Sequence, residues 1–219
     1  MTSGKAAGLF TAFVLVAAGG AACRKSSADD HLKKANAYYE QSKLPEAIIE
    51  LRAALQIDPR RGDVRMKLGD AYVLTNDPAG ALREYTRSAD LQPTSAEAQI
   101  KAGAYLLLAR SFEDAQTRAN RALEIDPKNT DAQILLGNAQ AGLKNFDGAV
   151  STYEEAIALD PAKYQGYVSL GTIQYVQGKR DEAEKTFNKA VETAPKSVPA
   201  RLALANFYWA GKRTQDTER

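Results

Sequence analysis

Apolar residues recur at helical spacing in two short segments between residues 131 and 159, separated by a polar turn. The first segment carries an apolar stripe, and so does the second; these stripes are Ile134, Leu135, Leu136 and Ala139, then Ala149, Tyr153, Ala156 and Ile157. Lys144-Asn145 lies between them, and Asp160-Pro161 follows the second. Proline disfavours helical backbone in the residue before it and supplies no helix donor. The pattern predicts two amphipathic helices joined by a tight turn.

The same pattern recurs along the chain with a period of 34 residues. Three residue types keep this spacing: alanine at 47, 81, 115, 149 and 183, proline at 59, 93, 127, 161 and 195, and glycine at 69, 103, 137 and 171. The repeats are predicted at about 28–61, 62–95, 96–129, 130–163 and 164–197. A fixed period of this length indicates a stacked helical array in which each unit packs against its neighbours.

The glycines predict a close contact between helices. Glycine inside a helix costs about 1 kcal/mol relative to alanine, so its repeated use favours a place with no room for a side chain. The Ala47 series is predicted to meet these glycines from the second helix. Larger residues fill the neighbouring position, namely Leu51, Tyr85, Tyr153 and Phe187, with Ala119 as a small exception in the third repeat.

With Leu-Gly at 136–137 and 170–171, then Ala149 and Asp160-Pro161, the chain resembles the tetratricopeptide-repeat (TPR) family over residues 28–210. The resemblance implies an all-α, right-handed superhelical solenoid of helix-turn-helix repeats, five complete and a sixth partial. It also implies a protein-binding scaffold and no enzyme activity. Repeats two and five depart from the pattern, because Gln92 and Ala194 stand where the other three repeats have aspartate.

Residues 198–219 are predicted to form a partial sixth repeat and a polar tail. Residues 200–210 have the pattern of a first helix, and the proline of another complete repeat would lie at position 229, beyond Arg219. Terminal repeats need a polar outer face. Two interpretations stay open: this helix is a cap, or the sequence is a fragment of a longer array.

The first 22 residues have the pattern of a secretory signal peptide. Lys5 precedes an apolar stretch over 9–16 and a run of Ala and Gly over 17–22, and the chain's only cysteine, Cys23, follows directly. The segment resembles a bacterial lipoprotein signal, which implies that Cys23 is lipidated and that residues 23–27 form a polar tether. Gly20 departs from that family's usual aliphatic residue. An uncleaved membrane anchor and an ordinary cleaved signal remain alternatives.

Composition argues against several classes of function. The formal charge is only +2, from 29 basic and 27 acidic residues, and no basic stripe appears, so nucleic acid is not an expected partner. One histidine, His31, and one cysteine cannot form a metal site. Glycine-rich phosphate loops are absent, and no nucleophile with a base is recognisable. We therefore expect no catalytic residues, metal, cofactor or small-molecule substrate.

In the TPR family, first helices line a concave groove that contacts the partner. Carried over to this sequence, the predicted groove residues are Asn36, Tyr39, Met66, Asp70, Ile100, Leu107, Leu108, Asn138, Thr172, Tyr175, Asn206 and Trp209. The asparagines share one phase of the repeat, and an amide can pair with a peptide backbone through both donor and acceptor. The alternative is that they bond to a neighbouring helix. The apolar run 105–109 is a further candidate for partner contact or self-association.

These patterns predict a scaffold in the bacterial cell envelope, lipid-anchored and facing the periplasm, that binds an extended protein segment. Such a scaffold would assist secretion, envelope assembly or exopolysaccharide export, an expectation that rests on resemblance alone. A transmembrane anchor or secretion is the alternative location. The alternative functions are a self-associating architectural protein and a regulatory fragment of a larger protein.

Overall fold

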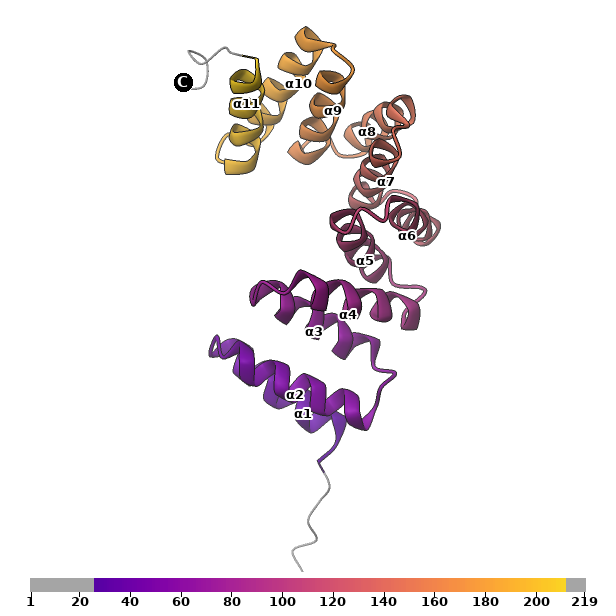
Figure 1. The fold of residues 1–219 in the computed structure, drawn as a ribbon, viewed down its shortest axis with the longest axis vertical. Coiled ribbons are helices and arrows are strands. Elements are labelled where there is room, and N and C mark those ends of the chain that lie inside the picture. The colour runs from indigo at the N-terminus through magenta and orange to yellow at the C-terminus, as the bar shows by residue number, and fades with distance from the viewer. Residues whose placement is uncertain (1–25, 212–219) are drawn as a thin grey trace, which may run out of the picture.

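The computed structural model describes residues 26–211, and within this range all regular structure is helical. Successive helices pack against one another along the chain (Figure 1). The helices are α1 (Ala28–Glu40), α2 (Leu44–Ile57), α3 (Gly62–Leu74), α4 (Pro78–Leu91), α5 (Ala96–Leu108), α6 (Phe112–Ile125), α7 (Thr130–Gly142), α8 (Phe146–Leu159), α9 (Tyr164–Val176), α10 (Arg180–Thr193) and α11 (Val198–Ala210). The predicted all-α solenoid is confirmed, with five helix pairs followed by one further helix.

The stack bows, so that it has an inner and an outer side (Figure 1). The odd-numbered helices are the first helices of the repeats. From α5 to α11 each of them also contacts the first helix of the next repeat, whereas the second helices pack mainly against the helices that flank them. Elements on the inside of a curved stack lie closer together. The first helices therefore form the inner face.

The Asp-Pro junctions between repeats have a local hydrogen-bonding reason. Asp58 and Asp126 have extended backbone directly before proline, and Asp160 has similar angles of φ −139° and ψ 85°, since proline disfavours helical backbone in the residue that precedes it. Each carboxylate also accepts a hydrogen bond of 3.1–3.2 Å from the backbone N–H two residues later. The turn thereby gives a hydrogen-bond partner to a backbone N–H that lies beyond the end of the helix. Gln92 and Ala194 cap the remaining second helices with a non-helical backbone, with ψ of 64° and 73°, and without that acceptor.

The turn inside each repeat places one residue in the left-handed backbone region. The five equivalent residues are Ser42, Asn76, Arg110, Lys144 and Gly178, with φ between 57° and 79°. Only the fifth repeat has glycine there, so the other four repeats carry a side chain in a conformation that favours glycine.

Replacing Gly178 with alanine is expected to destabilise the array by about 1 kcal/mol, because a Cβ is disfavoured at positive φ. A Cβ at this position would meet no atom within 4 Å, so the cost is one of backbone conformation alone. The reverse change, Lys144→Gly, is expected to stabilise by a similar amount. Urea unfolding measures both, and equal stability of the parent and the two variants would contradict this account.

The glycine ladder does mark a close contact, but the nearest atoms are not those of the predicted Ala47 series. The nearest atoms to a Cβ at Gly69 are those of the Tyr85 ring, beginning at 2.6 Å, and at Gly171 the Phe187 ring lies 3.2 Å away. The Ala47 series is fully buried but supplies none of these nearest atoms. The glycines therefore make room for an aromatic ring of the second helix, which lies four residues after the alanine of the Ala47 series.

The third repeat fills the same space differently. Its second helix has only Ala119 at the aromatic position, and Gly103 is met instead by Leu135 of the next repeat, whose Cδ2 lies 2.5 Å from a Cβ placed there. The equivalents of Leu135 in the neighbouring repeats are the polar residues Lys101 and Ser169. A large apolar side chain has thus replaced a polar one where the ring is missing, which keeps the core packed.

Within residues 26–211, none of the helices is both long and apolar enough to span a lipid bilayer. The predicted signal peptide, Cys23 and most of the polar tail lie outside the described residues. Residues 26–27 of the predicted tether are described, and Ser27 caps α1 through a reciprocal pair of hydrogen bonds with Asp30.

Candidate functional site

The inner face is built from three rows of residues, each with one member on every first helix. A central row is largely polar, and it is flanked by two apolar rows. The central row is Asn36, Asp70, Ala104, Asn138, Thr172 and Asn206; the flanking rows are Leu32, Met66, Ile100, Ile134, Val168 and Leu202, then Tyr39, Val73, Leu107, Ala141, Tyr175 and Trp209. All members of the central row are at least partly exposed. This arrangement offers polar groups along the middle of a face and apolar contacts on both sides.

The first two repeats form an amino-terminal hollow of about 430 Å³, lined by Asn36, Tyr39 and Glu40 of α1 and by Lys67 and Asp70 of α3. The Tyr39 hydroxyl donates to the backbone carbonyl of Lys67 at 2.7 Å, which fixes the ring at the wall of this hollow. Burial, with the charge of Asp70 as a second cause, raises the pKa of Tyr39 to about 12. Tyr39 is therefore a neutral side chain at physiological pH.

Asp70 holds the second and third repeats together. Its Oδ1 accepts hydrogen bonds from the Tyr85 hydroxyl and from the Lys101 ammonium, both at 2.7 Å. Burial and then the hydrogen bond to Asp70 raise the pKa of the Tyr85 hydroxyl well above its usual value. The Asp70 carboxylate is thus a structural acceptor as well as a member of the groove.

Asn138 has the same structural role two repeats later. Its Oδ1 accepts from the Tyr153 hydroxyl at 2.7 Å and from the Ser169 hydroxyl at 3.4 Å. Where the aromatic position holds tyrosine, the central-row residue of the same repeat is a hydrogen-bond acceptor, Asp70 or Asn138. In the fifth repeat the aromatic residue is Phe187, which has no hydroxyl, and the central-row residue is Thr172. The side-chain oxygen of Asn138 is thus bonded to neighbouring helices, as the alternative interpretation of the asparagines predicts.

The other two asparagines of the central row differ from Asn138. Within residues 26–211, no hydrogen bond joins the side-chain amide of Asn36 or of Asn206 to another residue. Both line hollows of the inner face. Among the described residues these amides have no hydrogen-bond partner, so their donors and acceptors are available to pair with a bound peptide backbone.

The last repeats form a carboxy-terminal hollow of about 340 Å³ that is more apolar than the first. It is lined by Thr172, Tyr175, Phe187, Ala203, Asn206, Phe207 and Ala210. The Tyr175 and Phe207 rings meet edge to face with centroids 5.6 Å apart. This hollow combines an aromatic wall with one free amide, a surface suited to an apolar side chain on a peptide.

The remaining predicted groove residues do not line these two hollows. Met66 packs against the core of the first repeats, and Ile100 and Leu107 are half-buried. Leu108 is 71% exposed and Trp209 is 70% exposed. Within the apolar run 105–109, packing therefore leaves Leu108 uncovered.

Sequence reasoning missed Lys67, Glu40 and Phe207 as members of the hollows. Glu40 and Lys67 lie next to the predicted positions in the helical register, so a wider window around the central row would have included them. The sequence also gave no sign that the Nδ1 atom of His31 forms a hydrogen bond of 2.5 Å with Glu50.

Two family models match the chain, one described as TPR repeat over residues 35–76 and one as tetratricopeptide repeat over 106–170 and 142–199. Together they cover more than half of the sequence. No curated protein matches the chain in sequence.

Several solved structures have a similar fold. MamA is 28% identical with a TM-score of 0.65, over 74% of this chain and 95% of that one. MamA from Desulfovibrio magneticus RS-1 is 19% identical with a TM-score of 0.69, over 80% and 98%. YrrB, a TPR protein with an unusual peptide-binding site, is 20% identical with a TM-score of 0.66, over 81% and 91%.

Proposed function

We propose that this chain, which belongs to the tetratricopeptide-repeat family, binds an extended segment of a partner protein along its inner face. Members of this family are in general protein-interaction scaffolds, and the proposed role is non-enzymatic. The peptide-binding site of YrrB is a property of that protein, and a likeness at 20% identity carries only the fold. Peptide binding by this chain is therefore argued from its own inner face.

The observation that carries the proposal is the pair of amides at Asn36 and Asn206, which have no hydrogen-bond partner among the described residues. They share one phase of the repeat, and each lies in its own hollow. An amide that donates and accepts can pair with a peptide group whatever the side chain of that residue. Apolar rows flank both amides, so successive side chains of an extended segment, which point to opposite sides, would each meet an apolar surface.

The location that we propose is the bacterial cell envelope, with the repeats facing the periplasm. The sequence of residues 1–23 supports this, since a lipid on Cys23 would tether the array next to a membrane. Substrates or components of secretion, envelope assembly or exopolysaccharide export are the corresponding partners.

A self-associating architectural role is the second candidate, and α11 is the observation that favours it. Leu202 and Trp209 on this helix are 56% and 70% exposed. Within the described residues, no second helix packs on α11 as α10 packs on α9. A second copy could cover this apolar surface.

Replacing Asn36 or Asn206 with alanine is expected to weaken binding of a partner segment about tenfold, because one or two hydrogen bonds of about 1 kcal/mol each are lost. The partner is captured from envelope extract on the immobilised full-length chain, and its bound segment is then synthesised for fluorescence-polarisation titration. The variant that loses more affinity locates the segment at the amino-terminal or the carboxy-terminal hollow.

Asn120→Ala is the matched control, since Asn120 is an exposed asparagine on the second helix α6. The control should bind the segment as the parent does. Equal binding by the parent, both groove variants and the control would place the interface outside the inner face. If the immobilised chain captures only further copies of itself, and its sedimentation mass rises with concentration, the architectural role is favoured.

A further inference from the structure

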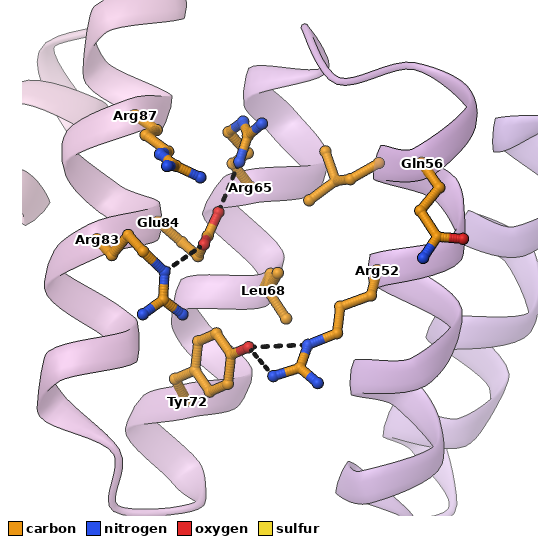
Figure 2. A pocket seen from close by; sticks show the side chains of 9 residues that line it. Arg52, Gln56, Arg65, Leu68, Tyr72, Arg83, Glu84 and Arg87 are labelled. Carbon is orange, nitrogen blue, oxygen red and sulfur yellow. Dashed lines mark hydrogen bonds and ion pairs between the residues drawn. The ribbon is translucent and has the colours of Figure 1, made fainter.

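Four arginines converge on a hollow of about 330 Å³ between the second helices α2 and α4, above α3 (Figure 2). We call it the arginine pocket. It is lined by Arg52, Leu55 and Gln56 of α2, Arg65, Leu68 and Tyr72 of α3, and Arg83, Glu84 and Arg87 of α4. It lies on the side of the second helices and is separate from the inner face.

The base of the arginine pocket is rigid. Leu68, Tyr72 and Glu84 are buried, and the two carboxylate oxygens of Glu84 bond different arginines. Oε2 accepts from Arg65 at 2.8 Å, and Oε1 accepts from Arg83 at 3.0 Å. This hydrogen bond and the charge of Glu84 outweigh desolvation and raise the pKa of Arg83. Glu84 therefore positions two guanidinium groups rather than cancelling the charge of the pocket.

Arg52 and Arg87 are left to face an incoming group. The Arg52 guanidinium reaches from α2 to the Tyr72 hydroxyl, with bonds of 2.6 and 3.1 Å, and Arg87 points from α4 toward the same opening (Figure 2). The guanidinium carbons of Arg52 and Arg83 each lie 5.7 Å from the centre of the Tyr72 ring. Among the described residues, neither Arg52 nor Arg87 has an acidic partner.

The charge of this pocket is out of proportion to that of the chain. Four arginines and one glutamate give it a formal charge of +3, whereas the whole chain carries +2. The rest of the protein is therefore slightly acidic. The positive charge is concentrated at one place where the helices form a hollow. Asp77 also acts on Arg83 through its charge.

The repeats themselves supply an internal comparison. A hollow of about 370 Å³ between α8, α9 and α10 is lined by residues at positions three repeats later. The charged residues of the arginine pocket are replaced there as follows: Arg52 by Glu154, Arg65 by Tyr167, Arg83 by Lys185, Glu84 by Thr186 and Arg87 by Lys189. The hollow is thus a product of repeat geometry, whereas the guanidinium lining belongs to one site. One repeat along from the arginine pocket, Asp90 bonds Arg118 at 2.7 Å and so supplies an internal anion.

We propose that the arginine pocket binds a phosphate group. Guanidinium groups bind tetrahedral oxyanions through paired N–H donors, and arginines on opposite walls suit an anion whose oxygens point in several directions. Arg65 and Arg83 already share the single negative charge of Glu84, and the pocket still has a formal charge of +3. The additional ligand is therefore one that brings more than one negative charge. The size of the hollow fits a small phosphorylated molecule or a lipid headgroup, which present the same chemical group.

Isothermal titration calorimetry of the chain tests the proposal. It measures the affinity for inorganic phosphate and for pyrophosphate at a constant ionic strength set with chloride. The double variant Arg52→Gln/Arg87→Gln is expected to bind at least tenfold more weakly than the parent. Lys185→Gln/Lys189→Gln is the control, because it removes the same charge from the corresponding hollow three repeats later, and its affinity should stay within twofold. Far-UV circular dichroism checks the fold of each variant.

The double variant loses the Arg52–Tyr72 hydrogen bonds, which could disturb folding. The single variant Arg87→Gln tests the pocket without this loss, since Arg87 has no bonded partner among the described residues. Absence of saturable binding by the parent, or equal weakening of the arginine and lysine variants, would overturn the proposal. Co-sedimentation with phosphatidylcholine vesicles, with and without phosphatidic acid, identifies the source of the phosphate. Arginine-dependent recruitment indicates a headgroup, and phosphate binding without recruitment indicates a soluble ligand.

Discussion

Replacing Gly137 with leucine is expected to lower the free energy of unfolding by about 3 kcal/mol through overpacking. A Cβ at Gly137 would lie 2.8 Å from Cδ1 and 2.9 Å from Cζ of the Tyr153 ring. That ring is 1% exposed, and its hydroxyl donates to Asn138, so the ring cannot move away without losing a partly buried hydrogen bond. The better helix propensity of leucine returns only about 1 kcal/mol. Urea unfolding followed by circular dichroism measures the loss.

Gly171→Leu is the matched control at the equivalent position of the next repeat. The nearest ring atoms there belong to Phe187 and lie 3.2 Å from a Cβ, and phenylalanine has no hydroxyl that would hold the ring. We therefore expect a smaller loss of stability at Gly171 than at Gly137. An unchanged unfolding midpoint for Gly137→Leu, or a larger loss in the control, would refute the packing argument.

Replacing Glu84 with glutamine is expected to destabilise the protein by about 3 kcal/mol, because it removes one partner of a buried ion pair. The Glu84 and Arg65 side chains are 6% and 13% exposed, so Arg65 would keep its charge with little access to water. The glutamine amide nitrogen would also face the N–H donors of one of the two arginines. Arg83 is about half exposed and contributes less to the effect, since solvent screens its charge.

Glu155→Gln removes the same charge from an exposed position on α8 and should change stability by less than about 0.5 kcal/mol. Thermal and urea unfolding of both variants separate the loss of the buried pair from a general effect of charge. Similar stability of the two variants would show that Glu84 does not hold its arginines in the folded protein.

The candidate site was only partly predictable. Asn36, Asn138 and Asn206 share one phase in the sequence, and the sequence alone treats them as equivalent. The structure separates them, because Tyr153 supplies a hydroxyl that occupies the oxygen of Asn138, whereas the amides of Asn36 and Asn206 have no partner among the described residues. The phase of a repeat determines which face a residue lies on, but its hydrogen bonds depend on what the next helix carries.

The arginine pocket was not predictable from local pattern. Arg52, Arg65, Arg83 and Arg87 are spread over 36 positions on three helices, and in the sequence each is an ordinary charge on an amphipathic helix. The near-zero net charge gave no indication of a basic site. Concentration of charge is a property of the stacked helices, since only their packing brings the four guanidinium groups to one opening.

By itself, the sequence determined the repeat length, the helix pairs, the positions of the turns and the side of each helix that is buried. These follow from short-range causes: helical periodicity, the restriction that proline places on its neighbour, and the Asp-Pro turn. Tertiary structure alone decided that tyrosine or phenylalanine rings face the glycines, that Leu135 compensates for Ala119, and which polar groups stay free to bind a partner. The physical reason is that contacts between helices depend on the volume and hydrogen-bonding capacity of residues some 15 to 35 positions apart, which no local pattern records.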